Sequence, residues 1–105
     1  EAVNWYTKSA DQGYVHAQYN LANLYLRGDG VTQNDHLAFS WFLRAAEQGD
    51  APAQYNLGRM YLLGKGDNKN IIEGRFWIKQ ALENNDEYIG ILAQQVWDDF
   101  KLGSY

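Results

Sequence analysis

The side chains in this chain best suited to acid–base chemistry at neutral pH are two histidines, His16 and His36. Nucleophilic catalysis needs such a base beside a nucleophile, and a zinc site needs several His or Cys ligands at short spacing. The two histidines belong to different predicted helices, and the 105 residues include no cysteine. We therefore expect a protein that is not an enzyme and that uses neither a metal nor an organic cofactor.

Two short glycine motifs, Gly28-Asp29-Gly30 and Gly64-Lys65-Gly66, resemble parts of phosphate-binding loops. A nucleotide-binding loop follows a buried strand and carries a longer glycine pattern before its helix, and neither condition is met here. Because the two motifs occupy equivalent places in the chain, they are better explained as helix ends and the loops that follow them.

The charge balance excludes a second group of functions. The chain has nine Lys and Arg and thirteen Asp and Glu residues, so its formal net charge is −4 and its sequence pI is near 4.9. Such a chain carries no basic field that would attract nucleic acid or an anionic membrane. Acidic residues gather near the C-terminus, including Asp98 and Asp99, where we expect a solvated end and not a metal site.

The tryptophans reveal an internal repeat. Trp5, Trp41 and Trp77 are spaced by 36 residues, and fixed periods of about 20–50 residues are typical of repeat architectures. When the chain is shifted by this period, residues 17–21 align with the identical residues 53–57. A second shift by the same period gives a weaker match, so the third copy has diverged.

Within each period the apolar residues recur at helical spacing, and each repeat is expected to hold two helices, which we call A-type and B-type. The predicted helices are B-type at about 1–12, 35–48 and 71–84, A-type at 15–27 and 51–63, and a final helix at 87–102. Sustained period-two alternation and hairpin signals are missing. The sequence therefore predicts an all-α protein.

Residue types at the helix ends support these bounds. Gly13 and Gly49 follow B-type helices, where a left-handed residue is expected, and Asn85 takes this place in the third copy. Asn34 and Asn70 precede B-type helices, where an Asn side chain caps the first free amides. The three tryptophans lie on the apolar stripe of the B-type helices, so we expect them to pack in the core.

The repeated motif resembles the Sel-one-like repeat, a relative of the tetratricopeptide repeat with a longer loop in each unit. The resemblance rests on residues 17–31 and 53–66 and on Trp41 and Trp77, and it covers nearly the whole chain. It implies an α-solenoid, a right-handed superhelix of antiparallel helix pairs. It also implies a scaffold or adaptor for protein complexes, of a kind found in many bacterial proteins.

The repeat boundaries predict one domain over residues 1–105, with about two and a half repeats. Residues 1–12 are expected to be the B-type helix of a preceding repeat, 13–48 and 49–84 complete repeats, and 85–105 a degenerate capping helix. Because the sequence opens inside a helical pattern without Met or a signal peptide, we expect either a trimmed protein or further repeats ahead of it. Localisation stays open between the cytoplasm and the periplasm or exterior.

In a stacked array the A-type helices form a concave wall that a partner can reach. Residues three to four positions from the apolar face are expected to look into this groove. The candidate protein-binding residues are His16, Tyr19, Asn23, Arg27, Tyr55, Arg59, Leu62, Leu63, Tyr88, Ile91 and Gln95. Tyr and Arg, which are frequent interface hot spots, recur among them.

Some of these positions have two interpretations. Tyr19 and Tyr55 are identical in the two repeats, so they either bind a partner or only pack between adjacent A-type helices. Arg59 replaces the Asn of the first repeat and is a better candidate for partner choice. Asn20 and Asn56 recur beside the apolar face, where we expect a structural hydrogen bond to a loop backbone.

These observations favour a non-catalytic protein–protein interaction module or scaffold that binds a partner peptide or protein surface in the groove. One alternative is an inhibitor or immunity-type regulator that binds one specific enzyme or toxin, and another is a purely structural array that only spaces other domains. The expected partner is a protein or peptide, with no nucleic acid and no membrane insertion, and the oligomeric state stays open. Because the chain has no cysteine, packing alone must hold its helix pairs together.

Overall fold

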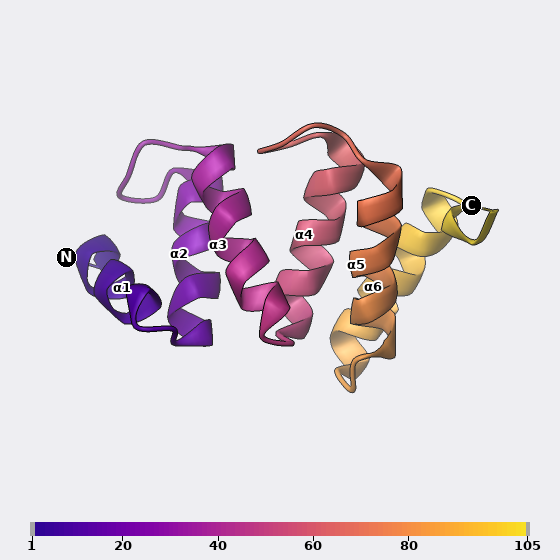
Figure 1. Ribbon diagram of the computed structural model, residues 1–105, viewed down its shortest axis with the longest axis horizontal. Coiled ribbons are helices and arrows are strands. Elements are labelled where there is room, and N and C mark those ends of the chain that lie inside the picture. Colours follow the sequence, from indigo (N-terminus) through magenta and orange to yellow (C-terminus); the bar gives the residue numbers. More distant parts are fainter. Residues whose placement is uncertain (1, 105) are drawn as a thin grey trace.

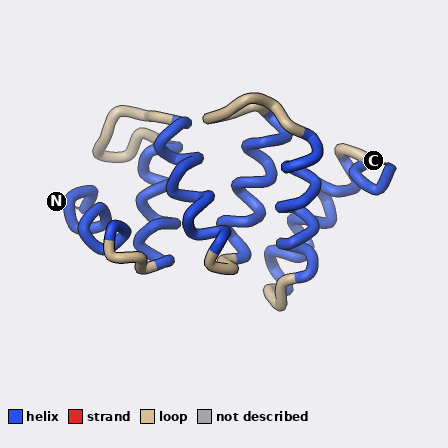
Figure 2. Tube along the Cα trace, viewed as in Figure 1, coloured by secondary structure: helices blue, strands red, loops and turns tan. Residues whose placement is uncertain are grey.

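The computed structural model describes residues 2–104, which form six α-helices and one short 3-10 helix (Figure 1). The elements are α1 (Ala2–Asp11), α2 (Val15–Arg27), α3 (Asp35–Glu47), α4 (Ala51–Leu63), α5 (Ile71–Glu83), α6 (Glu87–Asp99) and η1 (Leu102–Ser104). Figure 2 shows helices and loops and no strand within these residues. The all-α prediction is confirmed, and the expected helices differ from the observed ones by a few residues at their ends.

The helices stand side by side in chain order, and the two ends of the chain lie at opposite ends of the row (Figure 1). The principal extents are 44 × 27 × 18 Å, as expected for an array in which each element touches mainly its neighbours. Helices α2, α4 and α6 are the A-type helices, and α1, α3 and α5 are the B-type helices. No helix within residues 2–104 is long and apolar enough to cross a membrane.

The loops from A-type to B-type helices have the predicted caps. Gly28 and Gly64 end α2 and α4 with φ of 75° and 71°, a left-handed conformation that glycine adopts without strain. Asn34 and Asn70 then begin α3 and α5, and each side chain accepts a hydrogen bond of 3.0 Å from a backbone N–H of the first turn. Both loops therefore begin on a left-handed glycine and end on an Asn cap.

The turns from B-type to A-type helices agree with the prediction twice and depart from it once. Gly13 and Gly49 are left-handed, with φ of 93° and 90°. Asn85 is not: α5 ends on Asn84 in an extended conformation, with φ of −74°. The Asn84 side chain donates a hydrogen bond of 2.9 Å to the carbonyl of Gly49, which anchors the turn without a left-handed residue. The expectation for Asn85 is wrong.

Helices α4 and α5 pack closely because each contributes a glycine to the contact. A Cβ on Gly58 would lie 2.7 Å from Cδ1 of Ile78, and a Cβ on Gly74 would lie 2.6 Å from Cδ2 of Leu62. A larger residue at either position would force the facing Ile78 or Leu62 side chain, or the helix that carries it, to shift. The two glycines therefore set the spacing of the second repeat.

The tryptophan prediction holds for two of the three residues. Trp41 and Trp77 are partly buried and pack against the apolar cluster around Phe42 and Leu57. Trp5 is 63% exposed, so its expected place in the core is wrong. Trp41 also packs against buried residues of α1 and α2, whereas no helix among the described residues covers the equivalent side of α1.

Candidate protein-binding groove

The predicted groove residues lie on the three A-type helices, and most of their side chains reach the surface. Tyr19, Asn23 and Tyr55 are partly buried. The exposed members are His16, Arg27, Arg59, Leu63, Tyr88, Ile91 and Gln95. The remaining predicted residue, Leu62, does not reach the surface.

The Leu62 side chain is 1% exposed and belongs to the core cluster that includes Ile78 and Ala81. It fills the space that Gly74 of α5 leaves open, because a glycine there has no side chain of its own. The prediction that Leu62 binds a partner is wrong.

The two repeated tyrosines make different contacts. The Tyr19 ring packs edge-on against Phe42, with 5.7 Å between ring centroids. The Tyr55 ring lies under the guanidinium of Arg59, which is 5.6 Å from the ring centroid. Each ring also borders a core cluster and is only partly exposed. Tyr55 and Arg59 therefore form a cation–π pair at the surface of α4.

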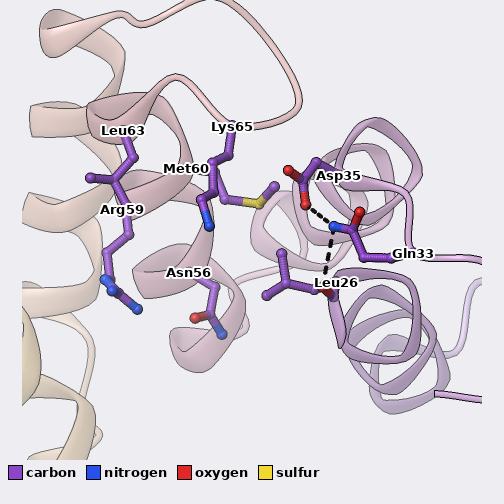
Figure 3. Close-up of a pocket in the computed structure, with 8 residues that line it drawn as sticks. All are labelled: Leu26, Gln33, Asp35, Asn56, Arg59, Met60, Leu63 and Lys65. Atoms are coloured by element: carbon purple, nitrogen blue, oxygen red, sulfur yellow. Dashed lines mark hydrogen bonds between the residues drawn. The ribbon is translucent and has the colours of Figure 1, made fainter. Parts of the chain in front are cut away.

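A pocket of about 130 Å³ opens between the end of α2 and the middle of α4 (Figure 3). Its apolar surface comes from Leu26, Met60 and Leu63. The remaining lining residues are polar or charged, namely Gln33, Asp35, Asn56, Arg59 and Lys65. Of the predicted groove residues, only Arg59 and Leu63 line this pocket.

The charged side chains in the pocket are not equally available. The Gln33 amide donates hydrogen bonds to the Asp35 carboxylate and to the backbone carbonyl of Leu26, so Asp35 is engaged by its own loop (Figure 3). Among the described residues, no carboxylate forms an ion pair with Arg59 or Lys65. The pocket therefore presents two cations that are free to meet an anion.

Sequence reasoning missed Asn56 as a lining residue. Neither Asn20 nor Asn56 makes a side-chain hydrogen bond within residues 2–104, so the expected bond to a loop backbone is wrong. Asn56 lines the pocket between α2 and α4, and Asn20 lines a second hollow beside α1. Their recurrence without an apolar role was the available signal.

The second hollow lies between α1 and α2. His16 lines this hollow and not the pocket between α2 and α4. Its walls are largely aromatic and include Trp5, Tyr6 and Tyr14. Tyr88, Ile91 and Gln95 lie on α6 and belong to neither hollow. The structure thus distributes the predicted set over three A-type helices and does not gather it in one pocket.

Two buried glutamines hold the A-type helices in place. Gln18 is 2% exposed; its amide donates to the carbonyl of Ala10 at 3.2 Å, and its side-chain oxygen accepts from Gln48 at 2.7 Å. Gln54 is 5% exposed and makes the same pair of bonds one repeat later, to Ala46 at 3.4 Å and from Asn84 at 3.3 Å. Gln18 and Gln54 align in the two repeats, but the sequence pattern alone indicates no role for them.

The Sel1 repeat model of known protein families matches residues 1–14, 15–50 and 51–86. Among curated proteins, the exopolysaccharide production negative regulator of Rhizobium leguminosarum bv. viciae is 49% identical over 39 residues. Those residues are 37% of this chain and 15% of the regulator, so the chain spans a small part of that protein.

Solved structures share the architecture. A Sel1 repeat protein from Oxalobacter formigenes aligns with a TM-score of 0.81 and 34% identity, over 91% of this chain and 40% of that one. A protective antigen of uropathogenic Escherichia coli with an SLR fold gives 0.79 and 34%, over 83% and 19%. The cysteine rich protein B of Helicobacter pylori gives 0.78 at 19% identity, over 86% and 68%, and so shows the fold alone. Because the family model matches most of its residues, the chain belongs to the Sel1 repeat family.

Proposed function

We propose that this chain is a non-catalytic protein-interaction module whose groove on α2, α4 and α6 binds a peptide or loop of a partner protein. Sel1 repeats generally mediate protein–protein interactions. The observation that carries the proposal is the distribution of differences between the two repeats. The recurring Gln18 and Gln54 are buried in the scaffold, whereas Asn23 and Arg59, which occupy one repeat position and reach the surface beside the groove, differ.

The repeat organisation that supports this groove is also a proposal. We infer that residues 13–48 and 49–84 are complete repeats, that 1–12 is the B-type helix of a preceding repeat, and that 85–105 is a cap. In α6, Gln94 and Asp98 hydrogen-bond to each other at 3.0 Å and are exposed. The complete repeats have Ala or Gly and Leu at these places, so the polar pair supports the assignment of α6 as a cap.

Selection of peptides from a random displayed library against the folded chain tests the proposal. We expect Tyr55→Ala combined with Arg59→Ala to weaken binding of the selected peptides by about thirtyfold or more, because truncation of a single Tyr or Arg hot spot costs about 2 kcal/mol or more. A matched control on α5 combines Phe76→Ala with Lys79→Ala, which also removes one exposed ring and one exposed cation. Fluorescence anisotropy gives the affinity, and circular dichroism melts check the fold.

The result that contradicts the proposal is the reverse pattern. Selected peptides that lose affinity with the Phe76 and Lys79 control, and keep it with the Tyr55 and Arg59 variant, would place binding on the opposite face.

The alternative function is an inhibitor or immunity-type regulator of one enzyme or toxin. The observation that favours it is the similarity of about one repeat to a protein named as a negative regulator. A tight complex of fixed one-to-one stoichiometry with a single enzyme, together with loss of that enzyme's activity, would favour this alternative. Binding of many peptides of related sequence favours the adaptor.

A further inference from the structure

We propose that the pocket between α2 and α4 selects partner segments that carry an acidic side chain next to an apolar one. This inference rests on the proposed groove function and names the chemistry that the groove prefers. The acidic side chain meets Arg59 and Lys65, and the apolar side chain lies on Leu26, Met60 and Leu63.

The two cations are not required by the fold. The first repeat has Asn23 and Asp29 where the second has Arg59 and Lys65. The backbone is nevertheless the same at both loops, since the N–H of Asp29 donates to Leu24 at 3.0 Å and that of Lys65 donates to Met60 at 2.9 Å. A repeat that folds identically with neutral and acidic residues at these positions does not need cations there, so the surface uses them for another purpose.

The positions of the cations suit a carboxylate. Arg59 lies over the Tyr55 ring, which restricts its guanidinium, and an ordered guanidinium gives a carboxylate short, charge-assisted hydrogen bonds. Lys65 follows the left-handed Gly64 and reaches the same pocket from the loop (Figure 3). Asp35 also lines the pocket, and its carboxylate accepts a hydrogen bond from Gln33, so the lining carries two cations and one anion.

The size of the pocket decides between a small molecule and a side chain. Its volume is about 130 Å³, well below the roughly 300–1,000 Å³ of typical small-molecule sites. A single side chain of a bound segment fits this space better than a separate metabolite does. The lining residues Leu26 and Leu63 are also partly exposed, so the next side chain along the segment lies against them at the mouth of the pocket.

Because the net charge of the chain is −4, a preference for acidic segments must come from the charges at the pocket itself. At a distance the chain repels an acidic segment, and only at contact, within the Debye length of about 8 Å at physiological salt, do the two cations dominate. The preference for acidic segments should therefore come from the pocket and not from long-range steering.

An array of short synthetic peptides tests the inference. Each peptide has a fixed Leu followed by Asp, Glu, Asn, Gln or Lys, and the labelled full chain is the binding protein. We expect the Asp and Glu peptides to bind about tenfold more tightly than their Asn and Gln counterparts. Arg59→Asn with Lys65→Asp, which installs the residues of the first repeat, should abolish that preference.

A charge-matched control separates the pocket from net charge. Lys8→Asn with Lys79→Asp makes the same change in net charge on B-type helices and should leave the preference intact. Equal loss with this control, or groove binding that ignores the carboxylate, would overturn the acidic preference while leaving the proposed function in place. Peptides whose binding does not respond to Tyr55→Ala with Arg59→Ala would overturn both.

Discussion

Residues 15–50 and 51–86 are two copies of one framework that present different surfaces. Both copies end the A-type helix on a left-handed glycine, begin the B-type helix with an Asn cap, and bury a Gln that bonds to the helix before it. They differ in charge beside the groove, where Asn23 and Asp29 become Arg59 and Lys65. The framework thus tolerates change at its surface without a change of backbone, which is how one fold can serve many partners.

The cores of the two copies also differ, and here the changes compensate each other. In the first repeat Ala22 shares a core cluster with α3, whose buried rings are Phe39 and Phe42. The second has Gly58, and the residue of α5 equivalent to Phe42 is Ile78, which packs directly on the glycine. The missing methyl group at Gly58 therefore leaves the room that the Ile78 side chain occupies.

Among the substitutions that compare the two repeats, truncation of the core leucine that both share should lower stability the most. Leu57 and its equivalent Leu21 are both fully buried, so each change to Ala should destabilise the chain by about 2–5 kcal/mol. We expect Leu57→Ala to cost more, because Leu57 lies in the larger cluster and its neighbours can collapse less. Urea denaturation followed by circular dichroism measures both, and an unchanged midpoint for Leu57→Ala would show that the second repeat is not built on this core.

The substitutions Gly58→Ala and Ala22→Gly should both lower the stability of the chain, for two different physical reasons. Gly58→Ala forces a methyl group against Ile78 and should destabilise the chain by about 1–3 kcal/mol. Ala22→Gly should destabilise it by about 0.5–1 kcal/mol, through backbone entropy. If Gly58→Ala instead stabilises the chain, as helix propensity alone predicts, then the close packing of α4 on α5 does not hold.

Removal of a buried Gln amide should destabilise the chain more in the first repeat than in the second. This order is the opposite of the one expected for the leucine substitutions. Gln18→Met and Gln54→Met keep the volume of the side chain and remove its hydrogen bonds, each worth about 0.5–1.5 kcal/mol. Gln18 has the shorter bonds, so its loss should lower the thermal midpoint more. A larger effect at Gln54 would contradict this ranking.

The smallest effect concerns the caps of the A-type helices. Tyr14 offers α2 no side-chain cap, whereas Asp50 caps α4 by accepting from Ala53 at 3.0 Å. Burial raises the pKa of the Asp50 carboxyl above its ordinary value of 3.8, although the bond from Ala53 and the nearby His16 act in the other direction. The folded state therefore holds the proton longer than the unfolded state does, and stability falls as the pH rises through the interval between the two pKa values.

Asp50→Asn keeps an oxygen that can cap α4 and removes this titration. Relative to the native chain, the variant should gain thermal stability as the pH rises from below to above the ordinary carboxyl pKa of 3.8, as measured by melts across that range. Melting curves of the two proteins that shift in parallel over the whole range would show that Asp50 does not contribute to the pH dependence.

The sequence predicts the helices and loops well because their signals are local. Gly64 and Asn70, for example, act through their own backbone and through the first turn that follows. Whether a helical residue faces the core or the surface depends on the neighbouring helices and not only on the local sequence. Leu26 and Leu62 occupy the same repeat position, yet Leu26 lines the pocket and Leu62 is buried against Gly74.

The candidate site was less predictable for the same reason. Arg59 could be proposed from its helix face, whereas Lys65 enters the pocket from a loop whose course depends on packing against α3. The His36 side chain contacts the carbonyl of Gly66 at 3.1 Å, a contact between residues 30 positions apart that no local pattern indicates. Residues contributed by such loops become visible only when the neighbouring helices are in place.

The glutamine bonds also determine how such an array can grow. Each one joins the end of a preceding B-type helix, an A-type helix and the end of the B-type helix that follows. A duplicated segment of one whole period brings its own donor and acceptor, so every buried amide finds a partner in the longer chain. An insertion that separates Gln54 from Asn84 in register would leave an amide unpaired. Gene duplication in whole repeats is therefore the route by which this scaffold can lengthen without losing stability.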